Sequence, residues 1–108
     1  MFSLSYSLRK LSLRQSRGGS VYAQYIMGDI YHMGQMVDRN NSKAAKWFEK
    51  AANQGMAEAQ REIGLIYYYG SGVNQDDALA KDWLKKSCEN GLKIGCEDYN
   101  YLYSSGSN

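Results

Sequence analysis

The sequence contains no proline, a single histidine and only two cysteines among its 108 residues. Without proline there is no proline-rich linker, and the short length allows one small core but no large two-domain enzyme. Because His32 is the only imidazole, sites that need two or more histidines are excluded. We therefore expect one small folded unit, with no metal site and no cofactor.

The sequence also lacks a large excess of either charge, and its first 19 residues lack a continuous apolar run. Thirteen basic and eleven acidic residues give a net charge of +2, which is too balanced to indicate nucleic-acid binding. Residues 1–19 contain four bases (Arg9, Lys10, Arg14 and Arg17) and no acid. Leucines alternate there with serine and arginine, which is not the pattern of a secretory signal peptide or a membrane span. We expect a basic, poorly ordered or loosely helical tail, with an organelle transit segment, a surface-seeking helix or a truncated leader as alternatives.

The sequence repeats itself with a period of 36 residues. Residues 20–55 and 56–91 align with eleven identities, where chance would give roughly two or three at this composition. Tyr103 and Gly106 continue the period beyond Tyr67 and Gly70. The chain therefore divides into two full units, 20–55 and 56–91, and a half unit, 92–108. The identical pairs are Ala23/Ala59, Gln24/Gln60, Gly28/Gly64, Ile30/Ile66, Tyr31/Tyr67, Gly34/Gly70, Val37/Val73, Ala44/Ala80, Trp47/Trp83, Lys50/Lys86 and Gly55/Gly91.

Each unit has the pattern of two helices. Apolar residues of the first unit recur on one helical face up to Gly34, a residue type that commonly ends helices. A second helix is expected from about Ser42 to Asn53. The half unit is expected to form one capping helix, from about Lys93 to Tyr103.

Two glycines lie inside the expected first helices, at equivalent positions of the two units. Gly28 and Gly64 each cost a helix about 1 kcal/mol relative to alanine. Their repetition therefore indicates close packing of a partner helix. We expect Trp47 or Trp83 to fill the adjacent space.

The segments YAQYIMGDIYHMG and AAKWFEKAANQG of the first unit, and AEAQREIGLIYYYGSGVNQDDALAKDWLKKSCENG of the second, resemble Sel1-like repeats (SLR), which are relatives of the tetratricopeptide repeat. The resemblance implies an all-α fold: a short right-handed α-solenoid of helical hairpins, with two full repeats and a C-terminal capping helix. The first unit departs from the pattern at Met36, where the second unit has Gly72, and at Asn40, where it has Asp76. These departures leave the conformation of the first loop open.

A solenoid of this type has a concave surface lined by the first helix of each pair. If the register matches that of tetratricopeptide repeats, this groove is rich in tyrosine, which offers contact area and a hydroxyl group at little entropic cost. For Tyr22, Met33 and Tyr69, ordinary packing is an equally good interpretation, and Tyr31 and Tyr67 are interpreted as packing residues. The predicted partner-binding residues are Tyr22, Tyr25, Asp29, His32, Met33, Arg61, Leu65, Tyr68, Tyr69 and Tyr101, with Glu58, Ile94 and Glu97 as further groove positions.

The two cysteines, Cys88 and Cys96, stand eight residues apart across the turn at Gly91. A short connection between antiparallel helices makes a disulfide geometrically reasonable, with two free buried thiols as the alternative. The segment LKKSCENGLKIGCEDY is similar to the cysteine-rich exported bacterial branch of the family. That resemblance implies a disulfide and hence an oxidising compartment such as a periplasm. The sequence shows no signal peptide, so a cytoplasmic location remains the alternative.

No pattern in the sequence indicates a catalytic site. Ser7 and Lys10 match the Ser-x-x-Lys motif of penicillin-recognising enzymes, but the companion Ser-Asp-Asn and Lys-Thr-Gly motifs are absent. We therefore predict a non-catalytic interaction module that binds a polypeptide segment of another protein on its concave face, with no nucleic acid and no membrane span. Two alternatives stay open: a β-lactam-active protein, which cysteine-rich relatives suggest, and a capping fragment of a longer repeat protein.

Overall fold

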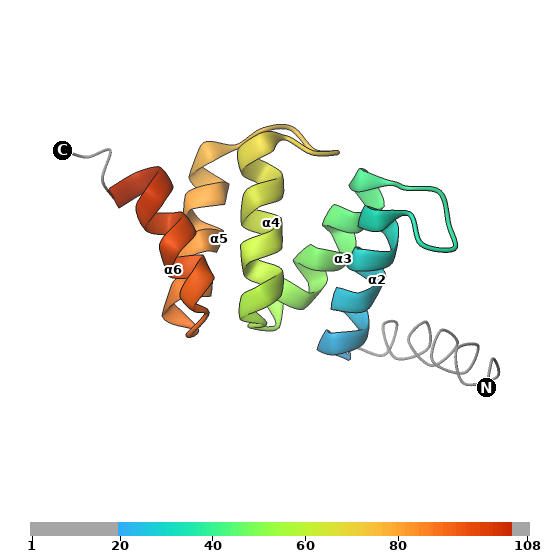
Figure 1. Ribbon diagram of the computed structural model, residues 1–108, viewed down its shortest axis with the longest axis horizontal. Helices are drawn as coiled ribbons and strands as arrows, with labels where there is room; N and C mark the ends of the chain where they lie inside the picture. Colours follow the sequence, from blue (N-terminus) through green and yellow to red (C-terminus); the bar gives the residue numbers. More distant parts are fainter. Residues whose placement is uncertain (1–19, 105–108) are drawn as a thin grey trace.

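The computed structural model describes residues 20–104, which form helices and turns without any strand. The tail at 1–19 and the repeat position Gly106 lie outside these residues. Figure 1 shows the helices following one another in chain order along the long axis, with α3 between α2 and α4 and with α5 between α4 and α6. The all-α solenoid of helical hairpins is therefore confirmed. The helices are α2 Val21–Met33, α3 Asn41–Asn53, α4 Ala57–Tyr69, α5 Asp77–Glu89 and α6 Lys93–Tyr99, and α6 runs into a π-helix, η1 Asn100–Ser104.

Helices α2 and α4 end at left-handed glycines, as the sequence predicts. Gly34 has φ 72° and Gly70 has φ 71°, and the N–H of each donates back to the last turn of its helix. Such a conformation costs a residue with a Cβ atom more than it costs glycine. At the start of the second helices, the side chains of Asn40 and Asp76 accept hydrogen bonds from the backbone of Lys43 and Leu79. The two hairpins are therefore bounded in the same way.

The first loop has the same conformation as the second in spite of its different residues. Met36 has a positive φ of 62° where Gly72 has 77°. In both loops the backbone N–H after the turn donates to the equivalent tyrosine carbonyl, from Asn40 to Tyr31 at 2.9 Å in the first loop. The surroundings differ: a Cβ atom on Gly72 would lie 2.5 Å from the backbone of Asn41 at the start of α3. Met36 is 70% exposed, so its side chain meets no such obstacle.

The two helices of each hairpin meet closely at the internal glycines. A Cβ atom on Gly28 would lie 2.6 Å from the Phe48 ring, and one on Gly64 would lie 3.0 Å from Leu84 Cγ. Our expectation that Trp47 or Trp83 fills this space is wrong. The residue that follows each tryptophan points at the glycine, and Phe48 and Leu84 are completely buried.

A repeated amide contact joins the start of the first helix to the end of the second within each unit, and small residues pack where the units meet. Buried Gln24 accepts a hydrogen bond from Gln54 at 2.8 Å, and the equivalent Gln60 accepts one from Asn90 at 2.9 Å. Gln60 also donates to the carbonyl of Ala52 at 3.1 Å, which links the second unit to the first. Paired amides satisfy polar groups that would otherwise be buried without a partner. The shared core consists of Ala44, Ala45, Phe48, Ala51, Ala52, Ala59, Ile63, Ile66 and Trp83.

The C-terminal cap is joined to the second unit covalently. Cys88 of α5 and Cys96 of α6 form a disulfide, with their Cα atoms 4.3 Å apart. Gly95 lets α6 pack against Ser87, whose hydroxyl donates to the carbonyl of Ala57 at 2.8 Å. The expected single helix from Lys93 to Tyr103 is corrected in one respect, because regular α-helix ends at Tyr99 and η1 completes the cap.

Replacing Gly28 by alanine should destabilise the fold although alanine is the better helix former. The added methyl group would overlap the Phe48 ring, and overpacking of this kind costs about 1–3 kcal/mol, more than the gain of about 1 kcal/mol in helix propensity. Urea denaturation should show a lower midpoint for Gly28→Ala. The double variant Gly28→Ala/Phe48→Leu, which has the leucine of the second unit, should recover part of the loss. A midpoint raised by Gly28→Ala would contradict this account of the hairpin.

Removing the disulfide should loosen the cap and leave the first unit intact. The bond closes a loop with a sequence separation of 8 residues, for which chain entropy predicts a loss of roughly 2–3 kcal/mol in Cys88→Ser/Cys96→Ser. Hydrogen exchange should accelerate in α6 far more than in α2 and α3. Equal acceleration in all helices would show that the bond acts on global stability instead.

Candidate functional site

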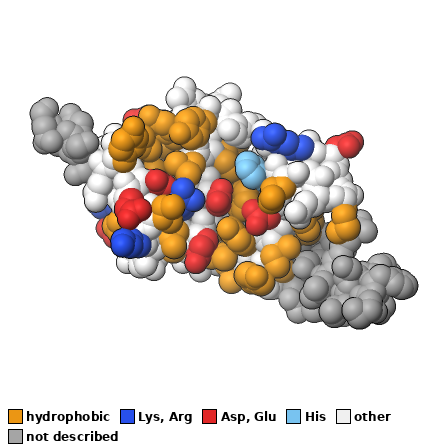
Figure 2. Space-filling view, viewed as in Figure 1, with side chains coloured by type: hydrophobic (Ala, Val, Ile, Leu, Met, Phe, Trp, Pro, Cys, Tyr) orange, Lys and Arg blue, Asp and Glu red, His pale blue; other side chains and the backbone are white. Residues whose placement is uncertain are grey.

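The surface formed by α2, α4 and α6, here called the first-helix face, contains most of the predicted binding residues. Figure 2 shows acidic, histidine and hydrophobic side chains close together on this side of the molecule. Four predicted residues on α2, α4 and η1 expose between 61% and 82% of their surface: Tyr22, Met33, Tyr69 and Tyr101. Exposed apolar side chains mark an interaction surface when they gather in a patch, whereas single ones are ordinary on a protein surface.

Two predicted residues of α2 pack instead on the hairpin core. The ring centroid of Tyr25 lies 5.6 Å from that of Phe48, and the His32 ring lies 6.4 Å from Phe48. Burial is the main cause that raises the pKa of Tyr25, and the neighbouring carboxylate of Asp29 adds to it. These residues therefore form the half-buried floor of the first-helix face.

A pair of half-buried carboxylates lies between α2 and α4. Burial raises the pKa of Asp29, while the nearby His32 opposes the shift. Burial also raises the pKa of Glu62; Arg61 opposes the shift, and the charge of Asp29 adds to it. Sequence reasoning missed Glu62, because the assumed register assigned only its neighbour Arg61 to the groove. Acidic groups with raised pKa values in a half-buried position can receive a hydrogen-bond donor or a cation.

Arg61, a predicted binding residue, is engaged within the fold. Its Nε donates to Oδ2 of Asp98 on α6 at 2.6 Å, and both side chains are about one quarter exposed. This is the one ion pair among residues 20–104. Arg61 therefore contributes to holding the cap on α4, and less of its charge is offered to a partner.

The C-terminal end of the first-helix face is a cluster of aromatic rings. Tyr68 packs edge-on against Tyr69 at 5.0 Å and against Tyr103 at 6.5 Å, and Tyr103 also contacts Tyr99. The Tyr103 hydroxyl donates to Asp77 at 3.1 Å, and burial, followed by this hydrogen bond, raises the pKa of Tyr103. Tyr68 is thus a packing residue as well as a surface residue.

The other groove positions differ in exposure. Leu65 is half-buried, whereas Glu58, Ile94 and Glu97 are exposed. The charge of Glu58 adds to the forces that raise the pKa of Tyr25, which places it near the floor of the face. The predicted residues therefore differ both in exposure and in chemistry.

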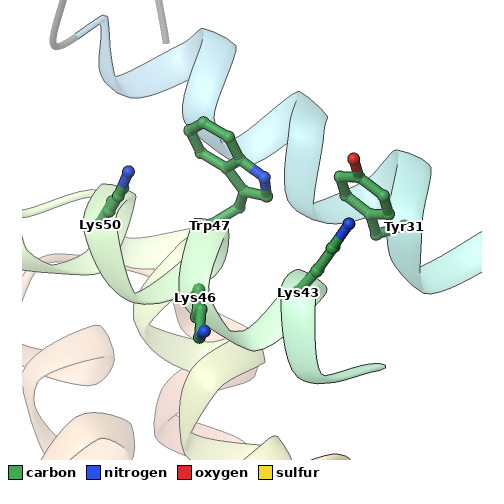
Figure 3. A pocket seen from close by; sticks show the side chains of 5 residues that line it. All are labelled: Tyr31, Lys43, Lys46, Trp47 and Lys50. Carbon is green, nitrogen blue, oxygen red and sulfur yellow. The ribbon is translucent and has the colours of Figure 1, made fainter. Parts of the chain in front are cut away.

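A hollow of about 330 Å³ opens on the first unit, away from the predicted groove. Figure 3 shows Trp47 of α3 reaching toward α2, and the ammonium group of Lys43 pointing at the Tyr31 ring. Nζ of Lys43 lies 5.4 Å from the Tyr31 centroid, and Nζ of Lys50 lies 4.4 Å from the Trp47 ring. We call this site the Trp47 hollow; it is lined by Tyr31, Lys43, Lys46, Trp47 and Lys50. Sequence reasoning had assigned Tyr31 to packing, and Tyr31 does pack on the core.

Metal-binding groups and membrane-spanning helices are both absent from the part of the chain that the structure describes. No group of three or more His, Cys, Asp or Glu side chains in the described part of the chain could hold a metal ion. None of the helices over 20–104 is long and apolar enough to span a membrane. The Ser7 and Lys10 motif lies outside the described residues, so the structure gives it no geometry.

Removing the charge of Glu62 should stabilise the protein near neutral pH. Because its pKa is raised by burial, the folded state favours the protonated carboxyl, and the ionised form costs stability above that pKa. Glu62→Gln should therefore raise the melting temperature by a few degrees at about pH 7. The gain should disappear toward about pH 4, where the unfolded chain also becomes protonated. Glu97→Gln, on an exposed site, is the matched control, and a gain for Glu62→Gln that does not depend on pH would contradict the burial argument.

Comparison with known proteins identifies the repeat. The family model for the Sel1 repeat matches residues 21–56 and 57–92. No curated protein sequence matches the chain.

Several solved structures are similar to this one. A Sel1 repeat protein from Oxalobacter formigenes is 33% identical with a TM-score of 0.77, over 82% of this chain and 35% of that one. A protective antigen of uropathogenic Escherichia coli strains that displays an SLR fold is also 33% identical, with a TM-score of 0.85 over 91% of this chain and 21% of that one. The chain thus spans about a third and about a fifth of these two proteins.

The cysteine-rich protein B of Helicobacter pylori shares the fold, with 24% identity and a TM-score of 0.81, over 86% of this chain and 70% of that one. Proteins built from Sel1 repeats are generally protein-interaction modules. With two matched repeats stacked as helical hairpins, the chain belongs to the Sel1 repeat family.

Proposed function

We propose that this protein is a non-catalytic interaction module that binds a polypeptide segment of another protein on its first-helix face. The observation that carries the proposal is the exposure of Tyr22, Met33, Tyr69 and Tyr101, each more than 60%. These side chains come from both units and from the cap, so a segment lying across the helices would contact all three parts. Tyrosine suits such contacts because its ring is large and rigid and its hydroxyl group can form hydrogen bonds.

The charges between α2 and α4 favour a segment that carries a donor or a basic residue. Asp29 and Glu62 are half-buried carboxylates near the middle of the face. A basic side chain placed there would offset the cost of ionising them, and acids in such a position disfavour an acidic segment. Electrostatic complementarity of this kind contributes to specificity and association rate.

The disulfide supports an oxidising location for this activity. A bond between Cys88 and Cys96 persists in extracellular or periplasmic conditions and is rare in a reducing cytosol. We therefore place the proposed binding in an exported or periplasmic setting. Thiol titration of protein purified without reductant should find no free thiol. Two free thiols would show that the bond is absent and would remove this support for the placement.

The binding test uses residues whose removal should not disturb the fold. A polypeptide captured with the native protein would be purified, and its affinity measured by calorimetry for the wild type and for Tyr22→Ala/Tyr69→Ala. Because both rings are largely exposed, circular dichroism should be unchanged while affinity falls by roughly tenfold or more, the usual range for aromatic contacts at an interface. The matched control, Lys85→Ala/Glu89→Ala on the exposed side of α5, should leave affinity unchanged. Equal affinity of the tyrosine variant and the wild type would reject the first-helix face as the binding surface.

A further inference from the structure

The two tryptophans of the repeat have different surroundings. Trp83 is only 8% exposed and belongs to the same buried cluster as the alanines of α3 in the preceding unit. Trp47 occupies the equivalent position in the first unit, but it is half-buried, lies outside that cluster and lines the Trp47 hollow. The hollow therefore lies on the side of the first unit that corresponds to the side of the second unit packed against α3.

Tyr67 and its equivalent Tyr31 differ in the charged side chain that lies near each ring. Burial is the main cause that raises the pKa of Tyr67, and the carboxylate of Glu49 on α3 is next. An acid of the preceding helix thus lies near this tyrosine. At the equivalent Tyr31, the nearby charge is the ammonium group of Lys43, 5.4 Å from the ring centroid. An occupant of the hollow that placed an acid near Tyr31, as α3 places Glu49 near Tyr67, would therefore bring that acid close to Lys43.

Two of the three lysines of the hollow occur in the first unit alone. Lys43 and Lys46 stand where the second unit has Leu79 and Asp82, and only Lys50 is repeated, as Lys86. All three lysines are exposed, and the ion pair of the described residues involves none of them. Three like charges around two aromatic rings favour an anionic occupant.

The loop of the first unit limits how an occupant can approach. Gly72 leaves room for the start of α3, since a Cβ atom there would lie 2.5 Å from the backbone of Asn41. Met36 holds the equivalent position and is 70% exposed. A unit stacked with the same geometry would bring its second helix against the Met36 side chain. The first turn of a docked helix must therefore lie farther from the loop than the start of α3 lies from Gly72. The Met36 side chain can then pack on the apolar side of that helix.

We propose that the Trp47 hollow is a docking site for an acidic amphipathic helix of another protein. Its small apolar residues would pack on Tyr31, Trp47 and Met36, and its acids would pair with Lys43, Lys46 and Lys50. The site lies on the stacking side of the first unit and is distinct from the first-helix face. The segment 1–19 is disfavoured as the occupant, because it carries four bases and no acid and would bring like charges together.

The probe for this site can be derived from α3, the helix that the second unit receives on its own Tyr67 and Trp83. A synthetic peptide of residues 41–53 would carry Gln in place of Lys43, Lys46 and Lys50, and Glu in place of Ser42 and Asn53, which share the side of the helix with Glu49. This peptide would be titrated into the full ¹⁵N-labelled chain. The control peptide would carry Gln at positions 42, 49 and 53 as well. Because a peptide of this length is a marginal helix in water, binding would be followed by NMR, which detects weak complexes. The indole N–H signal of Trp47 should shift, and the acidic peptide should bind at least about tenfold more tightly than the Gln peptide, with an affinity that falls as salt is added.

Two protein variants separate the lysines of the hollow from general charge effects. Lys43→Gln/Lys46→Gln/Lys50→Gln should lose about tenfold in affinity for the acidic peptide. The matched control, Lys85→Gln/Lys86→Gln/Lys93→Gln, removes the same number of charges from exposed positions outside the hollow and should bind as the wild type does.

Several outcomes would overturn the proposal. These are absence of binding, equal affinity for the two peptides, equal losses in the two triple variants, and shifts at Tyr22 or Tyr69 in place of Trp47. A change of the Trp47 indole signal on deletion of residues 1–19 would assign the hollow to that segment. A dimer in sedimentation without peptide that is lost in the Lys43/Lys46/Lys50 variant would assign it to a second copy of the chain. Tyr22→Ala/Tyr69→Ala should retain the peptide, so failure at the hollow and failure of the proposed groove can be distinguished.

Discussion

The structure depends on the close contact between the two helices of each hairpin at Gly28 and Gly64. With no side chain at these positions, Phe48 and Leu84 lie directly on the backbone of the first helix. A helix pair of this kind buries only one side of each helix, so the remaining apolar surface must be covered by the next unit. The same contact therefore determines both the hairpin and the need for stacking. It also leaves the opposite sides of α2, α4 and α6 available for binding.

Most of the fold could be predicted from the sequence because the turn and packing residues of one unit recur at the same positions in the other. Turn glycines, internal glycines and the cysteine pair have local causes, and they appear in the structure where the pattern puts them. The residue that fills the glycine contact could not be read in this way. Trp47 and Phe48 are neighbours on one helix and point about 100° apart, so only tertiary packing decides which faces Gly28. Trp83 faces the preceding unit and Trp47 lines the hollow, whereas Phe48 and Leu84 fill the hairpins.

The helix positions of the candidate site could be predicted from the sequence. Which of their side chains are already engaged within the fold could not. Arg61 is paired with Asp98, 37 residues away in sequence, and Tyr68 packs on Tyr103. Both contacts depend on where the cap comes to lie, which no local pattern encodes. Glu62 was missed for the same reason, because its half-buried place between α2 and α4 depends on how the two units stack. The repeat register predicts which side of a helix a residue lies on. Contacts between the units and the cap decide which of those side chains can still contact a partner.

The differences between the units show which surfaces are free to specialise. Several of the identities between the units are buried, such as Ala23/Ala59, Gly28/Gly64 and Ala44/Ala80. By contrast, the predicted binding positions differ in every pair, for example Tyr25/Arg61 and Asp29/Leu65. A ligand with its own regular repeat would meet different chemistry at each successive unit. The first-helix face therefore suits an irregular polypeptide, each part of which meets a different side chain, and the same reasoning applies to the lysines that only the first unit carries.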